Sequence, residues 1–362
     1  MKSIVISCML IIIMSSCSFE NNKLSKNISF SRKDLIEVKE LKNPEEIVID
    51  SLLFPASFRV IKDSILVVNN QPMCDYMLEF YSLKTLKPLA QMIKKGNGPG
   101  DMLSCYLDMH SSENTTFHLM DGKAKKYYKV DLDTLLYYKK LKPISSFGYS
   151  SEINPSTFIL DHSADTYIGC NMWYSPDEKF SNGISMPLSV FSKNVDNKKP
   201  MTDFKYFTAP VTGLLLFKNP QNGLIWAADK HRDRICIYND SLQLLSTIDG
   251  PDHFEMSYET VQSNSPVPFV TFTNKRDIRG YSDYFITDKY IYLVYEGNEY
   301  FEPMELSPVE VFKFDFDGNI VCNYKFDRYV YSISVDNNNK YLYCASRKNL
   351  QEPPTIIKYS LF

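Results

Sequence analysis

Two short loops rich in charged residues have the composition of a polar contact site. They are Asp229-Lys-His-Arg-Asp-Arg234 and Asp121-Gly-Lys-Ala-Lys-Lys126. Each combines an acid with bases at matching spacing, so both could contact an anionic or polar ligand. The other interpretation is that acid and base form salt bridges that brace neighbouring repeats of the fold, and we favour it because recurring positions in repeats tend to be structural. The candidate ligand-binding residues here are Asp121, Lys126, Asp229, His231, Arg232 and Arg234.

Oxygen-bearing side chains that follow apolar segments suggest a second chemistry, which is metal binding. They are Asn70, Asp121, Asn171, Asp229 and Glu296. Convergent carboxylate and amide oxygens are the ligands that Ca²⁺ prefers. A metal-dependent hydrolase or lactonase with a site in a central channel is therefore the alternative function. Bases near Asp121 and Asp229 could neutralise these acids instead, and no cofactor is expected outside this alternative.

Motifs of common enzymes are absent from the sequence. Its five His include no His-x-x-x-His pair, and neither Cys-x-x-Cys nor Gly-x-Ser-x-Gly occurs. The stretch Gly96-Asn-Gly-Pro-Gly-Asp101 lacks the Lys-Ser/Thr of a phosphate-binding loop, so we interpret it as a tight turn needing positive φ. A binding module is favoured over an enzyme, and we predict no catalytic or metal-binding residues.

Cysteines outside the first 17 residues are expected to be buried free thiols. Cys170, Cys236, Cys322 and Cys344 lie in apolar segments, where cysteine behaves as a small hydrophobe. Cys74 and Cys105 form the one pair that could be oxidised. The formal charge of −3 excludes the basic footprint of a nucleic-acid binder.

The N-terminus has the pattern of an export signal. Lys2 precedes an apolar stretch, Ile4 to Met14, that is too short to span a membrane comfortably. Met14-Ser-Ser-Cys17 resembles a bacterial lipobox, which implies cleavage before Cys17 and lipidation of that residue. The alternative is a cleaved soluble secretory peptide. We predict a signal peptide over residues 1–16, a lipidated tether over 17–28 and one folded domain over 29–362.

One apolar strand recurs six times and predicts the architecture. Its copies start at Ile65, Thr116, Tyr167, Leu224, Tyr290 and Tyr341, a spacing typical of propeller blades. Asn-Asp and Asp-Gly turns between apolar alternations around these copies indicate antiparallel hairpins. Helix signals are weak. The sequence therefore predicts an all-β, six-bladed β-propeller of four-stranded antiparallel blades.

The last predicted blade lacks its fourth strand, because one strand, Thr355 to Leu361, follows the sixth copy. We expect an N-terminal strand, either Leu35 to Leu41 or Glu46 to Ile49, to pair with that blade and close the ring.

Long connections should gather on one face of such a ring. Alternating strand direction puts the turns after first and third strands on one face and the other loops on the opposite face. The long inserts, residues 172–186, 250–283 and 297–307, all belong to the second group, and long loops in compact domains are usually functional or disordered. Trp173 and Tyr174 in the first insert are candidate binding anchors, although Trp173 could instead cover a blade edge.

The repeats, the lipobox and the turn at 96–101 together resemble the TolB-like six-bladed propeller lipoproteins of Bacteroidota, with Asp101 where Glu is frequent. That resemblance implies the fold and an envelope location. We therefore expect a lipid-anchored binding or scaffolding propeller for an envelope protein, peptide or glycan, with no nucleic-acid partner and membrane contact only through the anchor. The outer membrane is favoured, and the periplasmic or surface side stays open.

Overall fold

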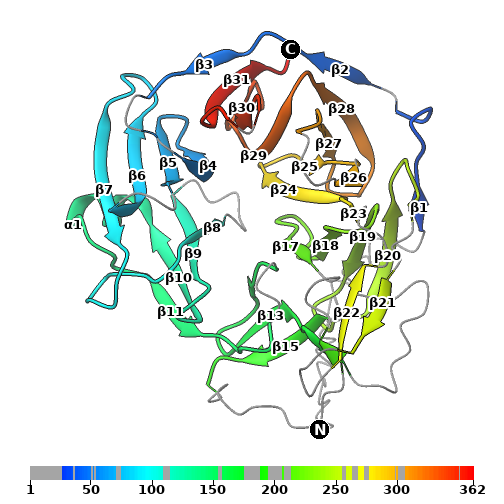
Figure 1. Cartoon of the computed structure of the whole chain (residues 1–362), viewed down its shortest axis with the longest axis horizontal. Helices are drawn as coiled ribbons and strands as arrows, with labels where there is room; N and C mark the ends of the chain where they lie inside the picture. Colours follow the sequence, from blue (N-terminus) through cyan, green and yellow to red (C-terminus); the bar gives the residue numbers. More distant parts are fainter. Residues whose placement is uncertain are drawn as a thin grey trace, which may run out of the picture.

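Six β-sheets, each a blade, stand in a ring around one axis (Figure 1). The computed structural model describes residues 27–35, 37–49, 52, 54–70, 75–108, 115–153, 157–174, 188–194, 206–207, 213–254, 258–262, 268–272, 277–297, 299–300, 306–349 and 351–362. The predicted signal peptide, including Cys17, lies outside these residues. In the part of the chain that is described, no helix is long and apolar enough to cross a bilayer.

The blades follow one another along the chain. Blade 1 contains β4 (Pro55–Ile61), β5 (Ile65–Asn70), β6 (Tyr76–Ser82) and β7 (Pro88–Lys94). Blade 2 contains β8 (Tyr106–Asp108), β9 (Thr116–Asp121), β10 (Lys126–Asp131) and β11 (Ser145–Gly148). The described strands of blade 3 are β12 (Leu160–Asp161), β13 (Thr166–Cys170) and β15 (Leu188–Ser192).

The second half of the ring repeats this order. Blade 4 contains β17 (Leu214–Lys218), β18 (Ile225–Asp229), β19 (Arg234–Tyr238) and β20 (Leu244–Asp249). Blade 5 contains β24 (Tyr281–Ile286), β25 (Ile291–Tyr295), β27 (Glu310–Phe314) and β28 (Ile320–Phe326). Blade 6 contains β29 (Tyr329–Val335), β30 (Tyr341–Arg347) and β31 (Thr355–Ser360).

The prediction of the fold class is confirmed, and the recurring apolar strand is the second strand of every blade. The six second strands, β5, β9, β13, β18, β25 and β30, each start within one residue of the predicted copy. They are buried almost along their whole length, since each blade packs on its neighbours through both faces. A strand covered on both sides needs apolar residues at successive positions, which explains the continuous apolar runs.

The N-terminal segment closes the ring and straps three blades from outside, as Figure 1 shows along its upper and right edges. The strand β3 (Glu45–Ile47) pairs antiparallel with β31 and supplies the missing fourth strand of blade 6. The expected closure is thus made by the second of the two candidate segments. The other, β2 (Val38–Leu41), pairs in parallel with β28 of blade 5, and β1 (Ile28–Ser29) pairs in parallel with β20 of blade 4.

A buried polar hub joins first strands of different blades near the axis. Arg59 of blade 1 is 1% exposed, and its guanidinium lies 3.2 Å from a carboxylate oxygen of Asp283 in blade 5. It also donates to the hydroxyl of Ser332 in blade 6, at 3.2 Å. The other carboxylate oxygen of Asp283 accepts from the amide of Ile333, at 2.8 Å. Because Arg59 lies 224 residues from Asp283 and 273 from Ser332, the hub fixes how the two ends of the blade series meet.

The hub reaches the remaining part of the ring through Tyr284. Its hydroxyl donates to Asp108 of blade 2 at 2.8 Å and lies 3.4 Å from the carbonyl of Leu216 in blade 4. Its ring contacts Phe158, which precedes β12, edge to face at 6.2 Å between centroids. Polar and aromatic contacts therefore link first strands all round the axis.

The two faces of the ring differ. Tight turns such as Lys62–Ser64 and Asn239–Gln243 lie on one, which we call the short-turn face; the opposite one is the insert face. The short-turn face also carries α1 (Leu132–Tyr138), a helix between β10 and β11 that was not foreseen. Lys62 of blade 1 forms an ion pair with Asp133 of α1 at 2.6 Å, which confirms that they share this face.

We predict that Arg59→Met lowers the free energy of unfolding by about 3–5 kcal/mol, because it leaves Asp283 as a buried, unpaired charge. Urea unfolding followed by circular dichroism measures the change. The control is Lys218→Met, which removes the exposed Lys218–Asp240 pair and should cost at most about 1 kcal/mol. Equal losses in both variants would contradict the proposed role of the hub.

Candidate functional site

The long inserts on the insert face are joined by backbone pairing. Strands β14 (Trp173–Tyr174), β16 (Tyr206–Phe207), β21 (Tyr258–Val261) and β22 (Phe269–Phe272) form one added sheet. Strands β23 (Asp277–Ile278) and β26 (Glu299–Tyr300) form another. The first sheet links the insert of blade 3 to the connection between blades 4 and 5, and the second links that connection to the insert of blade 5. The three inserts therefore form one continuous surface layer.

Trp173 and Tyr174, the predicted aromatic anchors, lie in this layer. Their backbones pair antiparallel with Phe207 and Tyr206. Their side chains, however, are outside the described part of the structure, so their role as binding anchors stays a prediction.

The loop of residues 229–234, which we call the blade 4 loop, is locked against the segment that enters blade 5. The amide of Gly280 donates to the carbonyl of Lys230 at 3.0 Å, and the amide of Glu296 donates to the carbonyl of Gly280 at 2.9 Å. The backbones approach so closely that a Cβ on Gly280 would lie 2.2 Å from the carbonyl oxygen of Arg232. Only glycine fits this crossing, and the crossing sets the positions of the side chains around it.

Basic residues of both segments lie at this crossing. Lys230, His231 and Arg232 come from the blade 4 loop, and Arg279 comes from the segment entering blade 5; all four are partly buried. We call this group the basic cluster. Two of its members, His231 and Arg232, were predicted from the sequence, whereas Lys230 and Arg279 were not. Glu296, another predicted residue, lies next to the cluster through its backbone contact with Gly280.

Burial alters the ionisation of two neighbouring groups in the blade 4 loop. Asp229 is 3% exposed, and its burial raises the pKa of its carboxyl to about 6, although Arg232 partly offsets the effect. Burial lowers the pKa of Lys230 to about 8, against the attraction of Asp283. The ammonium of Lys230 also lies 5.6 Å from the ring centre of Phe158, so it points toward the hub. Both shifts show that charge is poorly solvated here.

The remaining charges of the blade 4 loop have structural contacts. The Asp229 carboxylate accepts from the amide of His231 at 2.8 Å and lies 3.7 Å from the guanidinium of Arg232. Arg234 forms an ion pair with Asp249 of β20 at 2.5 Å, which braces blade 4 internally. Arg232 and Arg234 thus have different acidic partners, both of them in blade 4 itself, and the bracing of neighbouring blades by this loop stays a prediction.

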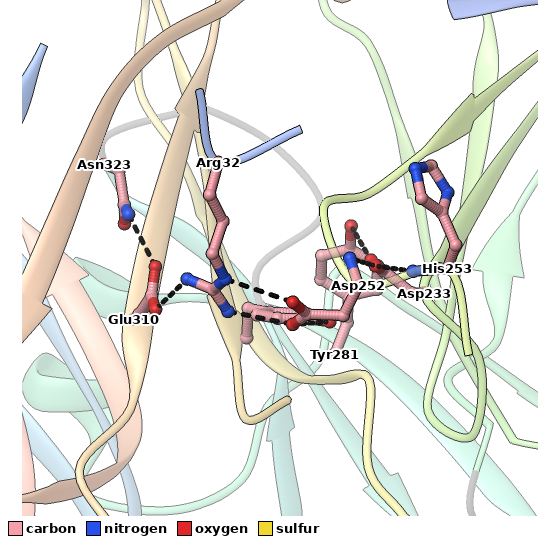
Figure 2. A network of polar contacts seen from close by, with 8 residues as sticks. Arg32, Asp233, Asp252, His253, Tyr281, Glu310 and Asn323 are labelled. Carbon is pink, nitrogen blue, oxygen red and sulfur yellow. Dashed lines mark hydrogen bonds and ion pairs between the residues drawn. The ribbon is translucent and has the colours of Figure 1, made fainter. Parts of the chain in front are cut away.

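The N-terminal segment from β1 to β3, which we call the strap, reaches the same loop. Its Arg32 contacts a network of acidic residues (Figure 2). Arg32 donates to both carboxylate oxygens of Asp252, at 3.0 and 2.8 Å, and also pairs with Glu310 of β27. The amide of Asp252 in turn donates to the carboxylate of Asp233 in the blade 4 loop, at 2.7 Å. Arg32 thereby links blade 5 to the segment that follows β20 of blade 4. That segment contacts the blade 4 loop through Asp252 and Asp233.

The second predicted loop is a structural brace. Asp121 is 1% exposed, and its carboxylate accepts from the amides of Leu103, Ser104, Lys123 and Ala124 and from the Ser104 hydroxyl. Lys126 is exposed at the start of β10, directly opposite Asp121 in the strand register. All the hydrogen bonds that Asp121 accepts here come from the chain itself, so this carboxylate has a structural role.

Metal-binding geometry is not found in the described parts of the chain. No group of three or more His, Cys, Asp or Glu side chains there could hold an ion. Among the strand ends that were candidate ligands, Asn70 accepts from the amide of Phe54 at 2.8 Å and donates to Glu79. Asn70, Asp121 and Asp229 thus each direct an oxygen to a backbone amide of the chain.

The other sequence motifs have structural roles. Gly98 and Asp101 close the turn at 96–101 through backbone and carboxylate hydrogen bonds, and Gly100 has a φ of +90°. Cys236, Cys322 and Cys344 are buried free thiols, as expected, and Cys105 and Cys170 are buried. Cys74 lies outside the described residues, so the pairing of Cys74 with Cys105 stays a prediction.

The family model and a solved structure agree with the propeller fold. The family model described as TolB-like 6-blade propeller-like matches residues 37–338. A solved structure of a DUF4221 family member from Bacteroides vulgatus has a TM-score of 0.56 at 10% identity, covering 88% of this chain and 96% of that one. A candidate exported protein from Bacteroides fragilis has a TM-score of 0.48 at 11% identity, covering 92% and 98%. No curated protein matches the chain significantly.

We predict that Asp229→Asn removes a pH dependence of stability. The pKa of Asp229 in the folded protein, about 6, lies above its ordinary value. The contribution of this carboxyl to the free energy of unfolding is therefore full below about pH 4 and is lost as the pH rises through 6. From pH 4 to pH 7 the variant should gain on the order of 2–3 kcal/mol relative to the wild type. Urea unfolding across this pH range measures the difference.

The control for this experiment is Asp288→Asn, since Asp288 is exposed in the turn after β24. Asparagine at 229 can still accept the amide of His231, so the comparison isolates the charge. A difference between variant and wild type that does not change with pH would argue against an uncharged Asp229 at acidic pH.

Proposed function

Because this chain belongs to the TolB-like six-bladed propeller family, we propose that it is an exported, lipid-anchored protein that binds a negatively charged envelope ligand through its insert face. The export pattern at the N-terminus supports the location, with Cys17 as the lipidated residue. Acyl chains on this cysteine would hold the propeller at a membrane, and two or more chains are needed for stable anchoring.

The basic cluster is the observation that carries the binding role. Two separate segments are locked together at Gly280, and they bring four basic residues close together in the backbone, beside the insert layer. A carboxylate placed there would favour the ammonium form of Lys230, whose pKa burial has lowered to about 8. Binding would thus add to the attraction that Asp283 already exerts on this ammonium group.

The insert layer supplies the area that such a ligand requires. Loops held on a rigid ring are common sites of recognition, because the ring fixes them while their sequences stay adaptable. The chemistry of the basic cluster favours a ligand with carboxylates, carried by an envelope protein, peptide or glycan. The added sheets would contact the neutral parts of that ligand.

The anchor is tested by metabolic labelling of the full chain with an alkyne fatty acid in a bacterial host. The wild type should be labelled and recovered with membranes, whereas Cys17→Ser should lose the label. Cys8→Ser is the matched control, because Cys8 lies inside the apolar stretch that is removed. Label that persists in Cys17→Ser, or that is absent from the wild type, would refute the anchor.

Binding is tested with residues 27–362 as bait for envelope fragments, followed by titration of each captured ligand. Arg232→Gln should weaken binding roughly tenfold or more, since charge-assisted hydrogen bonds in a partly buried site are strong. Raising the salt concentration should weaken binding as well.

The matched control for the binding test is Lys289→Gln, which removes an exposed charge from the short-turn face. Unfolding curves of both variants confirm that the fold is intact. Equal affinity of Arg232→Gln and wild type for every captured ligand would argue against the basic cluster as the binding site.

A further inference from the structure

Blade 2 exposes apolar side chains on the short-turn face, away from the basic cluster. Tyr137 at the end of α1 is 80% exposed, Tyr138 is 45% exposed, and Ile144 before β11 is 58% exposed. The rings of Tyr137 and Tyr138 meet edge to face, 4.9 Å apart. The helix that carries them is firmly held, because Leu132 and Leu135 are buried and Asp131 caps its first turn. These side chains therefore form a fixed feature of the surface.

Exposed lysines lie on the same face as these side chains. Lys139, Lys140 and Lys142 follow α1 directly and are exposed, and the ammonium of Lys142 lies 3.9 Å from the ring centre of Tyr138. Lys84 and Lys87, exposed in the turn between β6 and β7, lie on the same face of blade 1. We call these five lysines, with Tyr137, Tyr138 and Ile144, the lysine–tyrosine patch.

The acids near this patch are already engaged. Asp131 accepts from the amide of Thr134 as the helix cap, and Asp133 pairs with Lys62. Within the described residues, none of the five lysines of the patch forms an ion pair. The patch is therefore locally positive on a chain whose formal net charge is −3.

We propose that the lysine–tyrosine patch rests on an anionic phospholipid surface, in place of the expectation that the membrane is contacted only through the anchor. Tyrosine and lysine are the side chains that suit the boundary between lipid headgroups and acyl chains, since each has an apolar body and a polar end. Lysine is depleted from protein–protein interfaces, which makes a protein partner a poorer match for this patch. Each lysine near an anionic surface strengthens membrane binding, so the charge is complementary to the lipid.

The direction of the N-terminal strap is consistent with this orientation. Because β1 is parallel to β20, the chain enters β1 from the side of the short-turn face. An anchor upstream would place the membrane on that side and leave the insert face pointing away from it. This orientation rests on the proposed function, whereas the patch itself does not.

The test uses residues 27–362, which carry no lipid anchor, in cosedimentation with vesicles. Vesicles of phosphatidylethanolamine with about one third phosphatidylglycerol should bind the protein, and vesicles of phosphatidylcholine should not. Each lysine near such a surface accounts for roughly a fivefold change in partitioning, so Lys139→Gln/Lys140→Gln/Lys142→Gln should bind roughly a hundredfold less. Tyr137→Ser/Tyr138→Ser should also bind less, because it removes the apolar contact.

Matched controls come from other parts of the ring. Lys95→Gln/Lys123→Gln/Lys126→Gln removes three exposed charges from the insert-face ends of blades 1 and 2, and Leu244→Ser removes an exposed apolar residue of β20. Both should bind vesicles like the wild type. The substituted side chains in all these variants are exposed, so unfolding midpoints should stay unchanged.

Three results would overturn the proposal: equal binding to both kinds of vesicle, no binding to either, or equal loss in the patch and control variants. Titration of the captured envelope ligands distinguishes failure of the membrane contact from failure of the proposed ligand binding. The Arg232→Gln change should weaken ligand binding and leave vesicle binding unchanged, and the lysine variant of the patch should do the reverse. If the protein does not bind anionic vesicles but still binds its ligands, the membrane contact alone is refuted.

Discussion

The buried ion pair between Arg59 and Asp283 is the contact on which the ring depends. It joins blade 1 to blade 5, and Ser332 and Ile333 of blade 6 complete it, so it spans the place where the first and last blades meet. A charge with 1% exposure is tolerated only when its partner is in place, because burial removes the water that would otherwise solvate it. The hub therefore defines one arrangement of the blades, and the loops at their ends take their positions from it.

The two faces make different use of this fixed ring. On the insert face, strand pairing joins three inserts, and the crossing at Gly280 places the basic cluster beside them. On the short-turn face the connections are brief, and α1 is the element that projects side chains outward. The strap also holds the insert face, since Arg32 contacts Asp252, whose amide donates to Asp233 in the blade 4 loop. Closure of the ring and the positioning of the blade 4 loop thus involve neighbouring parts of one chain.

The fold was predictable because its second strands are covered on both faces. That burial produces apolar runs such as Ile65 to Val68, which recur at blade spacing and can be found without knowing their partners. The choice between the two N-terminal segments was not predictable, because β2 and β3 have similar patterns and differ only in the blade edge that each reaches. The helix α1 had a local signal in its Asp131 cap, but at seven residues it was too short to show periodicity.

The site was predictable only in part. His231 and Arg232 belong to a visible charge run, whereas Lys230 gains its significance from burial, and Arg279 from a crossing near Gly280 that no local pattern reveals. Arg32 meets partners 220 and 278 residues away, so its role depends entirely on the closed ring. Asp121 had the composition of a ligand-binding residue, and its five hydrogen bonds to the chain became evident only in three dimensions.

The strap also constrains the order of folding. Glu45 pairs with Lys358, which lies 313 residues further along the chain, so the segment made first must wait for the blades made last. Contacts of such long range form slowly, since the intervening chain has to be ordered before they become favourable. Until then β3 has no partner strand, and the edge of β31 stays open to other extended chains. We therefore expect ring closure to be the late, rate-limiting event of folding, and the incomplete ring to be the species most prone to aggregation.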